Sequence, residues 1–183
     1  MAFTAIYDAC VLYPAPLRDL LIRLGRTSLF RAHWTDRIHD EWMRSVIADR
    51  PDLDLQLLHR TRDLMNEAIP DVPVTGYEVI EPCLALPDAD DRLVLAAAIC
   101  CRADVIVTYN LKDFPAAVLK PFGVEAQHPD EFVHHLFHLH QAAVCATVKA
   151  QRESLKKPPV SARELPDTFW CNVFPALWPL WKR

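Results

Sequence analysis

The feature that most constrains the fold is the alternation of short, strand-like apolar segments with longer helix-like segments. Residues 3–7, 104–108 and 123–126 have the character of strands, whereas residues 17–24, 35–48 and 53–69 have the character of helices. Strands separated by helices are typical of a parallel sheet, because a parallel pair needs a long crossover connection. We therefore expect a three-layer α/β/α sandwich with a central parallel sheet, followed by a C-terminal helical extension.

Local signals refine these expectations. Thr35 is a suitable N-cap for the helix over 35–48, whose apolar stripe is Ile38, Trp42 and Val46. A short strand is expected over 77–80, a helix with an acidic first turn after residue 90, and one long helix over 130–152. We place one domain at 1–127 and the extension at 128–183, in which 154–166 resembles a linker and the end is an aromatic tail.

Composition excludes several classes of protein. Half of the 183 residues are hydrophobic (51%), which predicts a globular core. No apolar run approaches the roughly 18 residues needed to cross a membrane, and no signal peptide is evident. With only three glycines and no glycine-rich motif, a phosphate-binding loop is excluded. We expect a cytoplasmic protein whose six cysteines are reduced core residues: Cys10, Cys83, Cys100, Cys101, Cys145 and Cys171.

Acidic residues follow the predicted strands or begin the predicted helices. Asp8 stands in the apolar segment AIYDACVLY at the end of the first strand, and Asp113 follows the strand over 104–108. Asp91 opens a helix that precedes that strand, and Glu41 flanks the apolar stripe of the helix over 35–48. In a parallel α/β sheet, ligand sites form beyond the carboxyl ends of the strands. We therefore expect these carboxylates to meet at that edge.

Each acid also has a structural explanation. Asp88 is a suitable helix cap, Asp91 suits a first helical turn, and Asp113 is placed to cap a short helix. Asp8 is the hardest to explain in this way, because strands disfavour aspartate and its neighbours are apolar. Carboxylates brought together repel unless a cation neutralises them, and oxygen ligands without Cys or His favour Mg²⁺ or Mn²⁺. Such a site can activate water for attack on a phosphodiester.

Four motifs together resemble the PIN-domain ribonucleases, in particular the branch that includes the VapC-type toxins. They are YDACVLYP, the glutamate of IHDEWMRSV, DADDRLVLAAA and VIVTYNLKDF, in the family's order over residues 3–127. The resemblance implies an Mg²⁺- or Mn²⁺-dependent endoribonuclease of a toxin–antitoxin module. It also implies an RNA substrate, an antitoxin partner and a homodimer, without a membrane.

The resemblance assigns the site residue by residue. Asp8, Glu41 and Asp91 match the first three acids, and both metal binding and catalysis are expected of these three and of Asp113. Asp8 and Asp91 would bind the metal directly, while Glu41 and Asp113 would act through water or position the nucleophile. The fourth acid of the family is Asn110 here, and Asp113 is the nearest replacement. Candidates for substrate binding are Thr108, Asn110, Arg18, Arg23 and Arg26.

Other functions stay open. A PIN-type nuclease without a toxin role, acting on DNA or on a broad RNA pool, fits the same residues, and so does a degenerate, non-catalytic binding module, which Asn110 favours slightly. An aspartate-nucleophile phosphatase is disfavoured, because the second residue after Asp8 is Cys10 and not an acid. His134 and His138 have a spacing that can bind zinc, but a third ligand is not evident and a half-exposed helix face is the preferred interpretation.

Overall fold

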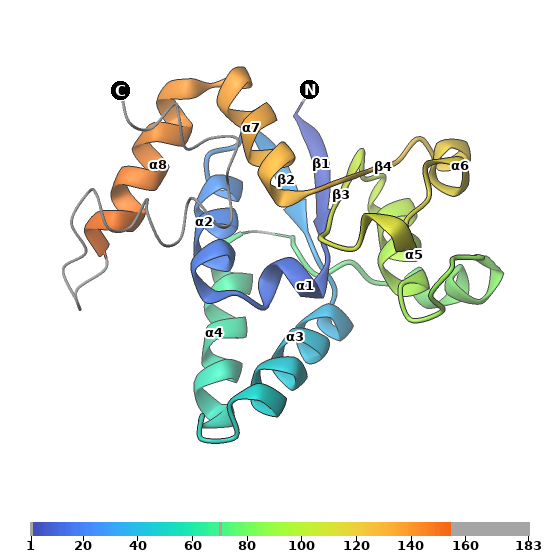
Figure 1. Cartoon of the computed structure of the whole chain (residues 1–183), viewed down its shortest axis with the longest axis horizontal. Helices are drawn as coiled ribbons and strands as arrows, with labels where there is room; N and C mark the ends of the chain where they lie inside the picture. Colours follow the sequence, from blue (N-terminus) through green and yellow to red (C-terminus); the bar gives the residue numbers. More distant parts are fainter. Residues whose placement is uncertain (1, 70, 155–183) are drawn as a thin grey trace.

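The chain folds around one parallel sheet, as the sequence predicts (Figure 1). The computed structural model describes residues 2–69 and 71–154. Four strands run in the order β2-β1-β3-β4: β1 (Phe3–Tyr7), β2 (Phe30–His33), β3 (Val105–Val107) and β4 (Glu125–Gln127). β1 is central, with Phe3 opposite Phe30 of β2 and Ala5 opposite Val105 of β3. The carboxyl ends of β1 and β3 therefore lie side by side.

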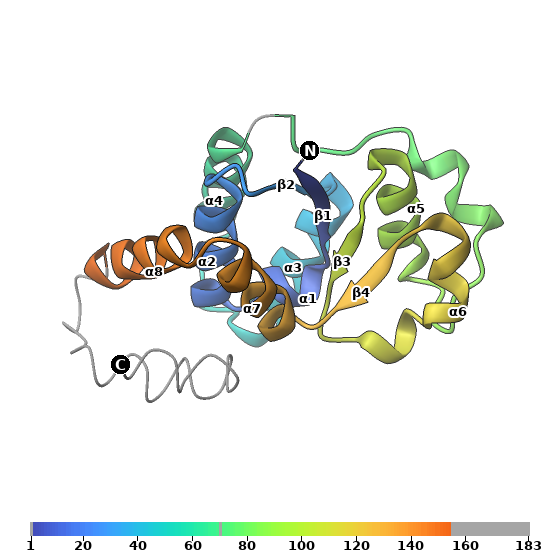
Figure 2. The ribbon, with the colours of Figure 1, turned by 90° about the horizontal axis from the view of Figure 1, so that it is seen from above.

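Helices cover both faces of the sheet, which gives the three predicted layers. Figure 2 shows α5 on one side of the strands and α2 and α7 on the other. The α-helices are α1 (Ala9–Leu12), α2 (Ala15–Gly25), α3 (Asp36–Asp49), α4 (Leu55–Ala68), α5 (Arg92–Cys101), α6 (Ala116–Leu119), α7 (Pro129–Leu139) and α8 (Gln141–Ser154). Short 3-10 helices cover Tyr77–Val79, Glu81–Cys83, Leu111–Asp113 and Lys120–Phe122.

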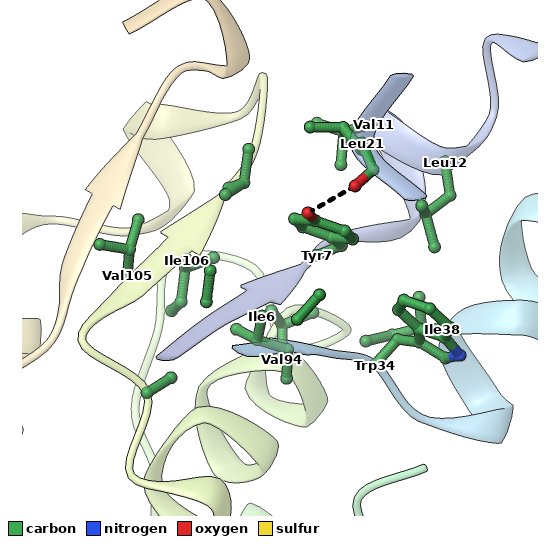
Figure 3. Close-up of a cluster of buried hydrophobic side chains, with 14 of the residues drawn as sticks. Ile6, Tyr7, Val11, Leu12, Leu21, Trp34, Ile38, Val94, Val105 and Ile106 are labelled. Carbon is green, nitrogen blue, oxygen red and sulfur yellow. Dashed lines mark hydrogen bonds between the residues drawn. The ribbon is translucent and has the colours of Figure 1, made fainter. Parts of the chain in front are cut away.

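Aromatic packing fixes the central strand on one face of the sheet. The ring of Phe3 stacks on Phe30 with centroids 5.5 Å apart, and Phe132 of α7 meets Phe30 edge-on at 5.1 Å. Tyr7 is fully buried and its hydroxyl donates to the carbonyl of Leu21 in α2 at 3.1 Å (Figure 3). Such aromatic pairs contribute about 0.5–1.5 kcal/mol beyond their buried area. Asp8 follows Tyr7 directly, so its backbone is attached to a rigid part of the core.

The predicted start of α3 is confirmed, one strand prediction is wrong, and one strand was not predicted. Thr35 is the N-cap of α3, and its side chain accepts a hydrogen bond from the amide of Ile38 at 3.1 Å. The strand expected over 77–80 is wrong, since this stretch contains a 3-10 helix that follows Gly76 with φ 79°. Strand β2, which the sequence did not predict, lies beside β1 instead.

Two further expectations change. The helix expected over 130–152 is two helices, α7 and α8, separated by His140 in a non-helical conformation (φ −155°, ψ 78°). The cysteines of the described residues are free, and Cys10, Cys100, Cys101 and Cys145 are half-buried and pack against the core; Cys83 is exposed, and its assignment to the core is wrong. Cys171, the linker from residue 155 onward and the aromatic tail lie outside the described residues, and the division at residue 127 stays a prediction.

Candidate active site

Asp8 occupies the first position beyond the carboxyl end of β1. Its backbone is extended (φ −74°, ψ 155°), and its amide continues the strand pairing by donating to the carbonyl of Val107 in β3 at 3.1 Å. The residue is 2% exposed, and its side chain makes no capping hydrogen bond to the short helix α1 that follows. A buried carboxylate that does not cap a helix needs another source of stabilisation.

Two side chains hold one oxygen of Asp8. The hydroxyl of Thr108, just past β3, donates to Oδ2 at 2.6 Å, and the thiol of Cys10 donates to the same oxygen at 3.1 Å. Among the described residues no hydrogen bond reaches Oδ1, so that oxygen is free to bind a ligand. Thr108 also accepts from the amide of Asn110 at 2.9 Å and is fully buried, so its hydroxyl positions Asp8 and is not exposed to a substrate.

Cys10 is a site residue that the sequence analysis had assigned to the core. Its sulfur accepts a hydrogen bond from the amide of Tyr109 at 3.3 Å, which ties the start of α1 to the loop after β3. Burial, and then the charge of Asp8, raise the pKa of the Cys10 thiol to about 12. Cys10 therefore stays protonated and acts as a donor to Asp8. Its position two residues after a strand-terminal acid was the available signal.

Asp91 connects the predicted acids into one electrostatic site. It occupies the N-cap position of α5, but its side chain makes no capping hydrogen bond, whereas Asp88 accepts from the amide of Asp90 at 3.0 Å and so supports the turn before the helix. Burial, and then the charges of Asp8, Asp88, Asp113 and Glu41, together raise the pKa of Asp91 to about 7. The four acids predicted from the sequence are therefore close enough to repel.

Glu41 approaches this site from α3. Ile38 and Trp42 on the same helix are fully buried and hold its inner face against the core. The residue as a whole is exposed, yet partial burial of its carboxyl and then the charge of Asp8 raise its pKa, while Arg44 opposes this shift. Glu41 thus lies at the rim of the site.

Asp113 is the better of the two candidates for the fourth acid. It ends the 3-10 helix Leu111–Asp113, is half-buried, and acts on the pKa of Asp91. The N-cap of α6 is Pro115, without a side-chain capping bond, so capping of that helix does not explain Asp113. Asn110 is exposed, and its backbone amide donates to the hydroxyl of Thr108, which also binds Asp8.

The chemistry of these donors fits a hard divalent cation. Asp8, Glu41, Asp91 and Asp113 offer only carboxylate oxygens, and the charges with the largest influence on the pKa of Asp91 are all acidic and raise it. Within residues 2–69 and 71–154, no three Asp, Glu, His or Cys side chains stand in a ready-made metal-binding arrangement. The carboxylates would therefore have to rotate toward a bound ion, as repelling groups can do once their charge is neutralised.

The three arginines predicted to contact substrate do not converge on the acids. Arg18 donates to the carbonyl of Leu12 at 2.6 Å and lies 4.4 Å from the ring centroid of Trp42, and burial lowers its pKa to about 10. Arg23 pairs with Asp19 at 2.9 Å and also bonds Ser154. Arg26 is exposed at the end of α2. The chain continues from there to the start of β2, so Arg26 lies toward the amino ends of the strands, away from the acids.

A parallel α/β/α sandwich with acidic residues gathered beyond β1 and β3 defines a PIN-like protein. A family profile described as the VapC50 C-terminal domain matches residues 129–170. The chain is also 43% identical over 77 residues to a Mycobacterium tuberculosis protein named "Putative ribonuclease VapC50", covering 42% of this chain and 46% of that protein. No solved structure gives a match. Both matches are to VapC50 proteins and support the likeness to the VapC-like PIN family, and the chain spans about half the length of the relative that it matches.

No helix of the described residues is both long enough and apolar enough to cross a bilayer.

Proposed function

We propose that the chain is an Mg²⁺- or Mn²⁺-dependent endoribonuclease and acts as the toxin of a toxin–antitoxin module. The observation that carries the proposal is Asp8, buried at the strand end with Oδ2 held by Thr108 and Cys10, and electrostatically coupled to Asp91. The name of the relative, a ribonuclease of the VapC type, supports RNA as the substrate.

The chain's own residues have separate tasks in this reaction. Thr108 and Cys10 fix Asp8 so that Oδ1 faces the reacting groups. Asp91, which burial and the neighbouring acids leave with a pKa of about 7 in the metal-free protein, would lose its proton when a cation binds and would hold that cation together with Asp8. Asp113 and Glu41 orient the attacking water, and the exposed amide of Asn110 can donate to a phosphate oxygen. A bound divalent cation would neutralise the phosphate charge and activate that water for in-line attack.

The experiment is RNA cleavage by purified protein with Mg²⁺, Mn²⁺ or excess EDTA. Asp91→Asn, purified in parallel, controls for contaminating ribonucleases, and single-stranded DNA of the same sequence tests the DNA-cleaving alternative. We expect RNA cleavage by wild type with either metal, and loss of cleavage in EDTA and in Asp91→Asn. Cleavage that persists in chelator, or equal cleavage by the variant, contradicts the proposal.

A non-catalytic RNA-binding module is the second candidate, and the observation in its favour is Asn110 at the position of the fourth acid. A binding module would bind RNA without metal and would not cleave it with either metal.

The toxin role adds an antitoxin partner and a homodimer to the proposal. A small DNA-binding protein encoded beside this chain, which co-purifies with it and suppresses cleavage, is the expected antitoxin. Light scattering of the purified chain measures its oligomeric state.

A further inference from the structure

Helix α7 carries a histidine pair that the acidic site does not use. Its inner face is anchored in the core, where Phe132 contacts Phe3, Tyr7 and Phe30. Its outer face presents His134, which is half-buried, and His138, which is exposed. Because the inner face is fixed, the backbone positions of the two histidines are fixed as well.

The two imidazoles point their Nε2 atoms at each other. The Nε2 atoms of His134 and His138 are 3.1 Å apart, and the ring planes are nearly perpendicular at 87° with centroids 4.4 Å apart. Two nitrogens bound at about 2.0–2.1 Å to one tetrahedral or octahedral ion lie roughly 2.8–3.4 Å apart. The observed separation therefore already matches two ligands of one ion, and the spacing of four residues places both on one helical face.

The geometry points to a transition-metal site formed by Nε2 of His134 and Nε2 of His138, with Zn²⁺ or Ni²⁺ as its ligand. Imidazole nitrogen suits these ions and not Mg²⁺. The described residues contain no cluster of three or more such ligands, so water or a group from another molecule completes the coordination. The result is an open, exchangeable site.

This site is separate from the acidic one. Figure 1 shows α7 extending toward the end of the molecule where the chain begins, whereas α1 and α3, beside Asp8 and Glu41, lie at the opposite end. The inference does not depend on the proposed ribonuclease activity, and its failure would leave that proposal unaffected.

The test is a Zn²⁺ titration followed by calorimetry, using protein without a histidine tag and with Mg²⁺ in excess to occupy the acidic site. His134→Gln and His138→Gln each remove one ligand. His135→Gln is the matched control, because His135 is exposed on the same helix but its Nδ1 faces Oε1 of Gln127 at 3.4 Å. Exposed cysteines such as Cys83 are present in all four proteins and contribute equally.

We expect both ligand variants to bind Zn²⁺ at least about tenfold more weakly than wild type, and His135→Gln to bind as wild type does. As a second measurement, Zn²⁺ should protect His134 and His138 of wild type from diethyl pyrocarbonate more than it protects His135, as read by peptide mass spectrometry. Equal affinity in all four proteins, or equal modification of the three histidines with and without Zn²⁺, overturns the inference and leaves the pair as a simple N–H···N contact.

Discussion

Replacing Asp8 with Asn asks whether the buried carboxylate serves a ligand or the fold. The amide keeps an acceptor oxygen for the hydroxyl of Thr108, at 2.6 Å, and for the thiol of Cys10, at 3.1 Å. A hydrogen bond to a charged group contributes about 1.5–3 kcal/mol and a neutral one about 0.5–1.5 kcal/mol. Each of the two bonds loses about 1 kcal/mol, so loss of the charge weakens the folded state by about 2 kcal/mol.

The same change relieves repulsion within the site. Burial and then the charge of Asp8 raise the pKa of Asp91 to about 7, and they also raise the pKa of Glu41. Each pKa unit corresponds to about 1.4 kcal/mol, which solvent screening reduces for half-exposed groups, so the relief is about 1 kcal/mol. The two effects oppose each other, and the net loss of about 1 kcal/mol predicts that metal-free Asp8→Asn melts only about 2–4 °C below metal-free wild type.

The assay is thermal melting of wild type and Asp8→Asn with and without Mn²⁺. A ligand at a hundredfold excess over its Kd stabilises the native state by about 2.7 kcal/mol, which predicts a rise of roughly 5–10 °C for wild type. Asp8→Asn should show little rise. Asp104→Asn is the control, because Oδ2 of Asp104 accepts from the amide of Thr4 at 2.8 Å at the other end of the sheet, and this variant should keep the full Mn²⁺ response. An Asp8→Asn protein that melts far below wild type and still responds to Mn²⁺ would refute the reasoning and make Asp8 a structural residue.

Two further predictions concern the other acids. Asp113→Asn should lower RNA turnover about tenfold or more, because Asp113 acts on Asp91, and Asn110→Ala should lower it less; the opposite ranking in the cleavage assay would assign the fourth position to Asn110. Because the pKa of Asp91 is about 7 in the folded protein against an ordinary 3.8, the folded state holds a proton that the unfolded chain releases. This contribution to stability is fully present below about pH 4 and is lost as the pH rises to about 7, so the unfolding free energy of metal-free wild type should fall relative to Asp91→Asn between about pH 4 and pH 7. Burial lowers the pKa of His33 and of His39 in both proteins, so their opposite effect cancels in this difference, and a flat difference curve contradicts the prediction.

The parts of the fold that the sequence predicted are those with a local signal. The cap at Thr35 and the apolar segment that ends at Asp8 both have such a signal, and the structure has α3 and β1 there. Strand β2, Phe30–His33, has two buried residues alternating with Arg31, which is exposed, and His33, which is half-buried. Four residues of this composition carry too little pattern, and pairing with β1 makes them a strand. At Tyr77–Val79 a strand was predicted and a 3-10 helix is found, because β-favouring residues do not form a strand without a partner strand.

The break between α7 and α8 shows a limit of capping rules. Neither glycine nor proline marks it, and the expected cap residues Ser, Thr, Asp and Asn are absent. His140 acts instead, since its Nδ1 accepts from the amide of Ala143 at 3.2 Å, and His128 accepts from Asp130 in the same way at the start of α7. Histidine caps are not among the usual signals, so the two helices were predicted as one.

The candidate site was predictable in its acids and not in what surrounds them. The order of strands and helices brings Asp8, Asp91 and Asp113 to one edge, but sequence cannot show which cations neutralise them. The structure shows Arg18, near that edge, donating to Leu12 and stacking on Trp42, and Arg37 pairing with Glu81 at 2.5 Å. No basic group is among the leading influences on the pKa of Asp91. A purely structural acid cluster would be expected to include its own cations, because an unpaired buried charge destabilises the fold. Arg44 and Arg37 act on Glu41 at the rim, but the leading influences on Asp91 are burial and other acids, and this is the physical argument that the inner acids await a cation from solution.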